Sequence, residues 1–164
     1  MAHGSVLRNG VPLSSKPKAV IFDYGRTLYD REGERFFLEA REVLEYLRPK
    51  YRLAIVSIAN EGDPPEARLK ALEEAGIRQH FSMILFHTKD KDRLLDRVLQ
   101  ELKVKPGELV LVDDRVKRSI AWGNKRGAIT IWLRKGKFAR ELPDEETGTP
   151  TYTIKHLSAL KELL

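Results

Sequence analysis

Short apolar runs of strand length alternate with segments of helical spacing along most of this chain. Five runs rich in Val, Ile and Leu predict strands at residues 18–23, 51–57, 82–86, 108–114 and 128–133. Their apolar residues are largely continuous rather than alternating with polar ones. This pattern is typical of strands that are buried on both faces of a parallel sheet.

Apolar residues three or four positions apart predict the helices between these runs. The first is expected from Phe36 to Leu47, and others over residues 63–75, 94–102 and 115–126. TYTI (151–154) and a final apolar helical face, Leu157, Leu160 and Leu164, close the pattern. Strands that alternate with helices predict an α/β fold with a doubly wound parallel sheet and helices on both faces.

The length of 164 residues fits a single domain, which we expect over residues 18–164. Residues 1–17 lack a hydrophobic period and are expected to be an extension, either disordered or left over from an expression tag. The absence of cysteine excludes disulfides, thiolate metal sites and a cysteine nucleophile. No apolar stretch approaches the roughly 20 residues of a membrane span, so we expect a cytoplasmic protein without a membrane partner.

The chain is basic, with a formal charge of +6 and a pI near 9.5. Such a surface attracts anions, which include phosphorylated small molecules, phosphorylated macromolecules and nucleic acid, but it identifies none of them. Charged residues of both signs are interspersed and make up 33% of the chain, as in many proteins from hot environments. The charge therefore leaves the partner open.

Polar residues that could form a site follow four of the predicted strands. They are Asp23, Ser57, Lys89 or Lys91, and the Asp113–Asp114 pair. Ligands of open α/β sheets bind at the carboxyl ends of the strands, where these residues should meet. Each has a simpler explanation: a turn or helix cap for the aspartates, a strand end for the serine and a solvated surface for the lysines.

The order Asp-x-x-x-Thr, Ser, Lys, Asp-Asp resembles the four motifs of the haloacid dehalogenase (HAD) superfamily, most of whose members are Mg²⁺-dependent phosphohydrolases. The resemblance spans about residues 18–160 and implies a HAD-like Rossmannoid core. It implies that Asp23 is a nucleophile forming an aspartyl-phosphate, and that Thr27 and Ser57 bind phosphoryl oxygens. It further implies a lysine that neutralises the phosphate, for which the spacing favours Lys89 over Lys91. The implied Mg²⁺ ligands are Asp23, the backbone carbonyl of Gly25, Asp113 and Asp114.

Gly25 departs from the family pattern, because the phosphatases of the family carry at this position an Asp that protonates the leaving group. Loss of a general acid costs about 10²–10⁴ in rate, least for acyl or activated aryl phosphates. We therefore expect a weak or specialised phosphohydrolase. The alternatives are a dehalogenase-like enzyme and a catalytically retired module that binds phosphate or another protein.

The intervals from Asp23 to Ser57 and from Ser57 to Lys89 leave no room for the cap domains of the family, so we expect an open site. Open members of the family often act on macromolecules or use a neighbouring subunit as a lid. An oligomer is therefore one of the alternatives. Basic residues follow the acidic pair and could ring the site, although solvent exposure is the simpler interpretation: Arg115, Lys117, Arg118, Lys125 and Arg126. The basic stretch 134–140 is expected to be a surface loop.

Overall fold

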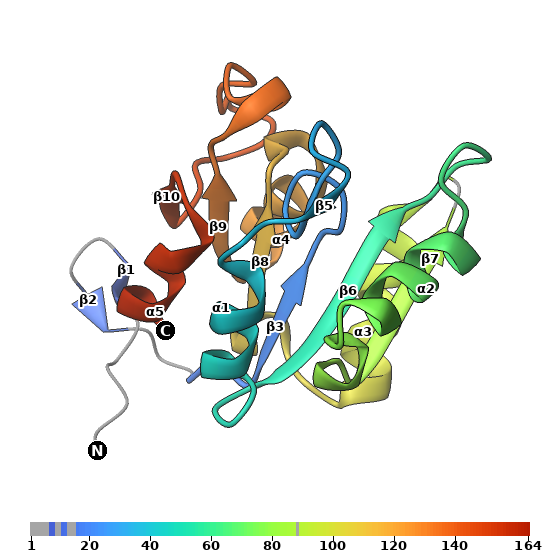
Figure 1. The fold of residues 1–164 in the computed structure, drawn as a ribbon. Helices are drawn as coiled ribbons and strands as arrows, with labels where there is room; N and C mark the ends of the chain where they lie inside the picture. The colour runs from blue at the N-terminus through green and yellow to red at the C-terminus, as the bar shows by residue number, and fades with distance from the viewer. Residues whose placement is uncertain (1–6, 9–10, 13–15, 88) are drawn as a thin grey trace.

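The structure is a computed structural model that describes residues 7–8, 11–12, 16–87 and 89–164. Its centre is a six-stranded parallel sheet in the order β10-β9-β8-β3-β6-β7 (Figure 1). The strands are β3 (Ala19–Phe22), β6 (Arg52–Ile58), β7 (Met83–His87), β8 (Leu109–Asp113), β9 (Ile129–Leu133) and β10 (Tyr152–Ile154). The doubly wound parallel sheet expected from the sequence is confirmed.

Helices cover both faces of this sheet because each central strand is apolar on both sides. Val20 and Phe22 of β3 face one layer, which contains α1 (Ala40–Leu47), α2 (Pro65–Glu74) and α5 (Leu160–Leu163). Ala19 and Ile21 face the other layer, with α3 (Lys91–Leu102) and α4 (Ala121–Arg126). The tryptophans of α4 and β9 are both buried. None of the described helices is long and apolar enough to span a membrane.

The first helix begins later than its apolar spacing predicts. Instead of starting the helix, Phe36 belongs to a small hairpin in which β4 (Tyr29–Asp30) pairs with β5 (Arg35–Phe36). The Phe36 ring packs edge-on against Tyr24 and Tyr29, with ring centroids 5.8 and 5.2 Å apart. This aromatic cluster favours the hairpin, and α1 begins only at Ala40.

The segment after β8 is also less regular than the continuous helix expected over residues 115–126. Val116–Ile120 forms a π-type turn with a non-helical residue inside it, Arg118 (φ −108°, ψ −119°), before α4 begins. The expected loop after β9 contains a short 3₁₀ turn, Gly136–Phe138, and leads to β10. Other 3₁₀ turns are Arg78–His80, Pro106–Glu108 and Leu157–Ala159.

Most of the predicted extension, residues 1–17, lies outside the described residues. Within it, β1 (Leu7–Arg8) pairs with β2 (Val11–Pro12) in a separate antiparallel ribbon. Between β3 and β6 the chain forms only the hairpin and α1, and between β6 and β7 only α2 and the first 3₁₀ turn. The carboxyl edge of the sheet is therefore bordered by short segments, as the sequence intervals imply.

Candidate active site

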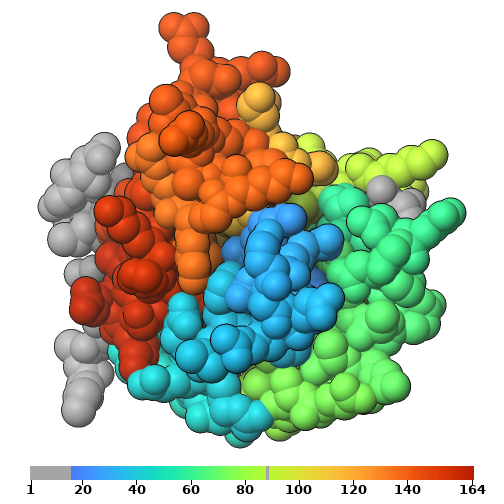
Figure 2. Space-filling view, turned by 45° about the horizontal axis from the view of Figure 1, so that its top comes forward, coloured from blue at the N-terminus to red at the C-terminus, as the bar shows by residue number. Residues whose placement is uncertain are grey.

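Three neighbouring strands deliver polar side chains to one point at the carboxyl edge of the sheet. Asp23 follows the central strand β3, Ser57 lies near the end of β6, and Asp113 ends β8. Figure 2 shows the blue segment after β3 between the green segment after β6 and the orange segment after β9. The parallel register explains why residues far apart in sequence meet here.

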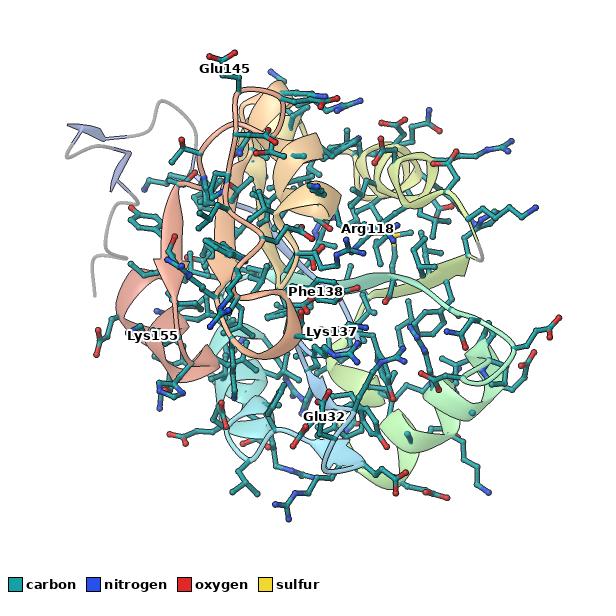
Figure 3. The ribbon with its side chains drawn as sticks, turned by 90° about the horizontal axis from the view of Figure 1, so that it is seen from above. Glu32, Arg118, Lys137, Phe138, Glu145 and Lys155 are labelled. Carbon is teal, nitrogen blue, oxygen red and sulfur yellow. The ribbon has the colours of Figure 1, made fainter. Side chains whose placement is uncertain are left out.

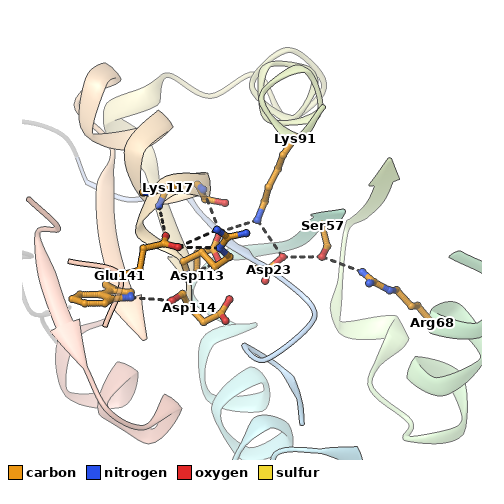
Figure 4. A network of polar contacts seen from close by, with 11 residues as sticks. Asp23, Ser57, Arg68, Lys91, Asp113, Asp114, Lys117 and Glu141 are labelled. Atoms are coloured by element: carbon orange, nitrogen blue, oxygen red, sulfur yellow. Dashed lines mark hydrogen bonds and ion pairs between the residues drawn. The ribbon is translucent and has the colours of Figure 1, made fainter. Parts of the chain in front are cut away.

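Asp23 connects Ser57 and Lys91 in the network shown in Figure 4. Its Oδ1 accepts hydrogen bonds from Ser57 Oγ at 2.7 Å and from Lys91 Nζ at 3.1 Å. The Ser57 hydroxyl in turn accepts a hydrogen bond from Arg68 Nη1 at 3.1 Å. The carboxylate is thus oriented from two sides, and its side chain stays 13% exposed toward the pocket.

Lys91, not Lys89, is the lysine of this site. Lys91 is the first residue of α3, and its Nζ lies 3.1 Å from Asp23 and 2.8 Å from Asp113. Lys89 is exposed, and its backbone N–H donates to His87 Nδ1. The sequence spacing favoured Lys89. In the structure Lys89 and Asp90 belong to the turn before α3, with Asp90 as the N-cap, so Lys91 is the lysine that reaches Asp23.

Burial lowers the pKa of Lys91, but the charges of Asp113 and Asp23 outweigh this effect and hold its pKa above the ordinary value. Burial likewise opposes ionisation of Asp113, whereas the Lys91 charge and the backbone N–H of Arg115 hold the Asp113 pKa below its usual value. Asp113 also accepts the N–H of Ser119 at 3.2 Å. Lys91 and Asp113 therefore form a buried ion pair.

Asp114 differs from Asp23 and Asp113, because among the described residues it forms no ion pair. Burial, together with the charges of Asp113 and Asp23, raises the pKa of Asp114 to about 9. Its backbone carbonyl is fixed by Trp132 Nε1 at 2.9 Å. One carboxylate oxygen from each of Asp23, Asp113 and Asp114 lies within 4.8 Å of the others.

This oxygen-only, acidic donor set fits Mg²⁺, which takes oxygen ligands and keeps several waters in its coordination shell. A divalent cation would also offset the repulsion that raises the Asp114 pKa. Gly25, whose carbonyl is the fourth ligand expected from the sequence, lines the same pocket. The structure thus brings together the four metal ligands named from the sequence, and their role remains a prediction.

Thr27, the other hydroxyl residue predicted to bind phosphate, does not line this pocket. It is fully buried, is absent from the residues lining the pocket, and its Oγ1 has no hydrogen-bond partner among the described residues. Its backbone N–H donates to the Tyr24 carbonyl within the turn after β3. Of the two hydroxyl residues predicted to bind phosphate, Ser57 therefore lines the pocket, and Thr27 lies within the turn after β3.

The pocket above Asp23 encloses about 250 Å³ and is strongly cationic. Besides Lys91 and the three aspartates, it is lined by five arginines from four different segments: Arg26, Arg31, Arg68, Arg115 and Arg118. Phe138, from the turn after β9, closes one side and lies under Arg115, whose guanidinium carbon is 4.1 Å from the ring centroid. Figure 3 shows Arg118 and Phe138 near the middle of the carboxyl edge and Lys155 at its periphery.

Sequence reasoning missed most of these arginines. Of the basic cluster after Asp114, Arg115 and Arg118 reach this pocket, whereas Lys117, Lys125 and Arg126 line a separate surface hollow. The sequence contained one indication that Arg68 is buried, because it lies one helical turn before Leu72 and therefore on the same face of α2. Arg31 gave none, because its position depends on the hairpin.

Comparisons with known proteins show which family this chain is similar to. The profile of the haloacid dehalogenase-like hydrolases matches residues 11–121, and a second HAD-like hydrolase profile matches residues 88–160. Glyceraldehyde 3-phosphate phosphatase of Pyrococcus furiosus is 30% identical over 129 residues, 76% of this chain and 52% of that protein. The chain therefore spans about half the length of this relative.

Solved structures share the fold. L-2-haloacid dehalogenase of Xanthobacter autotrophicus superposes with a TM-score of 0.69 at 15% identity, covering 90% of this chain and 98% of that chain. A HAD phosphatase of Thermococcus onnurineus superposes with a TM-score of 0.60 at 23% identity, covering 77% and 57%. From the profile match over more than half of its length, together with this fold and site, the chain belongs to the haloacid dehalogenase-like hydrolases.

Proposed function

We propose that this protein is a Mg²⁺-dependent phosphohydrolase in which Asp23 attacks phosphorus and carries the phosphoryl group. The observation that supports this most directly is the position of Asp23, whose Oδ1 is held by Ser57 and Lys91 beside two further aspartates. Asp23 also lines the cationic pocket, and its side chain is 13% exposed, so a bound phosphoryl group could reach the carboxylate. The phosphatase relatives support a phosphorylated substrate.

In the first step a bond forms between an Asp23 oxygen and phosphorus, while the bond from phosphorus to the leaving oxygen breaks. Lys91 and Ser57 lie where they can donate to the phosphoryl oxygens and to the nucleophile. Water then attacks phosphorus, releases phosphate and restores Asp23. Splitting hydrolysis in two lets a positioned carboxylate replace a free water in the first displacement.

Asp23, Asp113, Asp114 and the carbonyl of Gly25 are the groups that would hold Mg²⁺. When bound, Mg²⁺ neutralises charge on the phosphoryl group and orients it for in-line attack. Lys91 supplies the fixed positive charge of the site, which is present at neutral pH because its pKa is raised. The ion pair with Asp113 fixes the position of the ammonium group.

The test is hydrolysis of 4-nitrophenyl phosphate by the wild type, Asp23→Asn and Asp96→Asn, with and without Mg²⁺. Asp96 lies exposed on α3, so its variant makes the same chemical change away from the site. We expect Mg²⁺-dependent turnover by the wild type and Asp96→Asn, and only background hydrolysis by Asp23→Asn. Mass spectrometry after rapid acid quenching should find a phosphoryl adduct on the peptide that contains Asp23.

Wild-type protein that binds inorganic phosphate but hydrolyses no phosphate compound would favour the alternative of a phosphate-binding module. Turnover that is equal in the wild type and Asp23→Asn would remove Asp23 as nucleophile.

A further inference from the structure

Gly25 is the position at which the site lacks a general acid, and a cation fills the space of the missing side chain. A Cβ atom added to Gly25 would lie 2.8 Å from Arg31 Nε and 3.3 Å from Arg31 Nη2. The Arg31 guanidinium therefore lies where a carboxyl group attached to residue 25 would extend. The charge at this point is positive instead of negative or neutral.

Arg31 is held there by a carboxylate that it shares. Asp63 Oδ2 lies 3.4 Å from Arg31 Nη2 and 2.9 Å from Arg68 Nε. Arg68 is only 1% exposed and lies against the rings of Tyr24 and Phe86, 4.7 and 5.3 Å from their centroids. Its rigid environment fixes Asp63, and Asp63 in turn positions Arg31.

Positive charge is in excess beside Gly25, because one carboxylate faces two guanidinium groups. Both guanidinium groups also keep an unused donor: Arg31 Nε and Arg68 Nη2 are buried and have no hydrogen-bond partner among the described residues. Unpaired buried donors are costly, and an anion that accepts from them offsets this cost. The chemistry of this corner is thus that of an oxyanion site.

We propose, on the basis of the function proposed above, that Arg31 stabilises the leaving oxygen as an anion and takes the place of the missing acid. A guanidinium stays protonated in proteins, so it donates hydrogen bonds but no proton. The substrates that fit are those whose leaving group departs as a weakly basic oxyanion, such as acyl phosphates and phosphoanhydrides. Simple alkyl phosphates fit poorly, because their alkoxide needs a proton.

The atoms balance without a proton donor in the protein. As the bond from Asp23 to phosphorus forms, the electron pair of the breaking P–O bond stays on the leaving oxygen, which departs as a carboxylate or phosphate beside Arg31. Water later attacks phosphorus, the bond from the Asp23 oxygen to phosphorus breaks, and one proton of the water passes to solvent.

The experiment measures kcat/KM for aryl phosphates of increasing leaving-group pKa, from 2,4-dinitrophenyl to phenyl phosphate, in the wild type and Arg31→Ala. A hydrogen bond to a charged group is worth about 1.5–3 kcal/mol, or roughly 10- to 100-fold. We expect the loss in Arg31→Ala to grow toward that size as the leaving group becomes more basic. Arg35→Ala removes the same charge from an exposed residue outside this pocket and should leave the series unchanged.

A second readout needs neither metal nor turnover. Calorimetric titration of the metal-free proteins measures their affinity for pyrophosphate, which carries two phosphoryl groups, and for inorganic phosphate, which carries one. We expect Arg31→Ala to weaken pyrophosphate binding at least about tenfold while phosphate binding, which uses Lys91 and Ser57, changes little.

Two further results complete the test. Wild-type protein should cleave acetyl phosphate far faster than ethyl phosphate, and the double variant Gly25→Asp/Arg31→Ala should narrow that difference by improving ethyl phosphate. The role of Arg31 would be overturned if Arg31→Ala lowered kcat/KM by the same factor for every leaving group. It would also be overturned if the variant kept the wild-type affinity for pyrophosphate relative to phosphate. Either result would still leave an active phosphohydrolase. Absence of Mg²⁺-dependent turnover in the wild type would instead refute the proposed function and, with it, this inference.

Discussion

Replacement of Lys91 by methionine should destabilise the protein strongly, because it removes the cation from a buried cluster of carboxylates. The Lys91 side chain is 4% exposed and the Asp113 side chain 1% exposed, and their charged atoms lie 2.8 Å apart. Removing one member of a buried ion pair typically costs about 3–5 kcal/mol. We expect Lys91→Met to lower the free energy of unfolding at pH 7 by about 3 kcal/mol, since proton uptake by the aspartates relieves part of the cost.

The pH dependence of this loss follows from the directions of the pKa shifts. The pKa of Asp113 is depressed, so its stabilising pairing is present above the ordinary value of 3.8 and is lost as the pH falls through the depressed pKa. The pKa of Lys91 is raised, so its contribution persists up to alkaline pH. The difference between wild type and Lys91→Met should therefore be large at pH 7 and shrink in acid.

Urea unfolding followed by circular dichroism measures this difference, and Lys89→Met is the matched control. Lys89 is exposed, so its replacement should change the free energy of unfolding by less than about 0.5 kcal/mol. Mg²⁺ should restore part of the stability of Lys91→Met, because the ion replaces the missing positive charge. Equal effects of the two substitutions, or a loss in Lys91→Met that does not depend on pH, would refute the buried ion pair.

Three other perturbations test separate parts of the structure. Asp114→Asn should stabilise the metal-free protein at pH 7 by about 1–4 kcal/mol. The Asp114 pKa is raised to about 9, so the wild type loses stability as the pH rises from about 4 to 9, and the variant should not. Urea unfolding at several pH values should therefore show a free energy of unfolding that depends less on pH in the variant. Mg²⁺ should raise the melting temperature of the wild type but not of Asp114→Asn, since binding to the folded state alone stabilises it; a shift of equal size in both proteins would exclude Asp114 as a ligand. Gly123→Ala should cost about 1–3 kcal/mol, because its Cβ would lie 2.5 Å from Leu111 Cδ1 and 2.7 Å from Thr130 Cγ2; Gly62→Ala, whose nearest atom is Asn60 Oδ1 at 3.4 Å, is the control in the same unfolding assay.

The sheet was predictable from sequence because its strands are encoded by continuous apolar runs. Each of the five predicted runs became a strand within about two residues of its expected bounds. The start of α1 was not predictable, because Phe36 and Phe37 fit the helical spacing as well as Ala40 does. What decides against the helix is contact of Phe36 with Tyr24 and Tyr29, and spacing along one segment carries no information on that contact.

The site residues likewise divide into those whose position follows from a local sequence pattern and those whose position depends on contacts between distant segments. Asp23, Ser57 and Asp113 lie at strand ends, so the parallel topology brings them together. Lys91 depends on where a helix begins, and the N-cap at Asp90 determines that. Arg31 and Arg68 depend on Asp63, which lies at the start of the helix expected over residues 63–75. In the structure Pro64 is the N-cap of α2, and the Asp63 carboxylate binds the two arginines.

Gly25 shows how a residue that is absent from a motif changes meaning once its surroundings are known. From sequence, a glycine at this position indicates only that an acid is missing and that activity is weakened. In the structure the same glycine leaves room for the Arg31 guanidinium, which an Asp side chain would displace or pair with. Gly25→Asp alone should therefore restore little acid function, because an ion pair with Arg31 would hold the new carboxyl group in its ionised form. The two positions act as a unit, so a change in leaving-group chemistry requires both to be substituted.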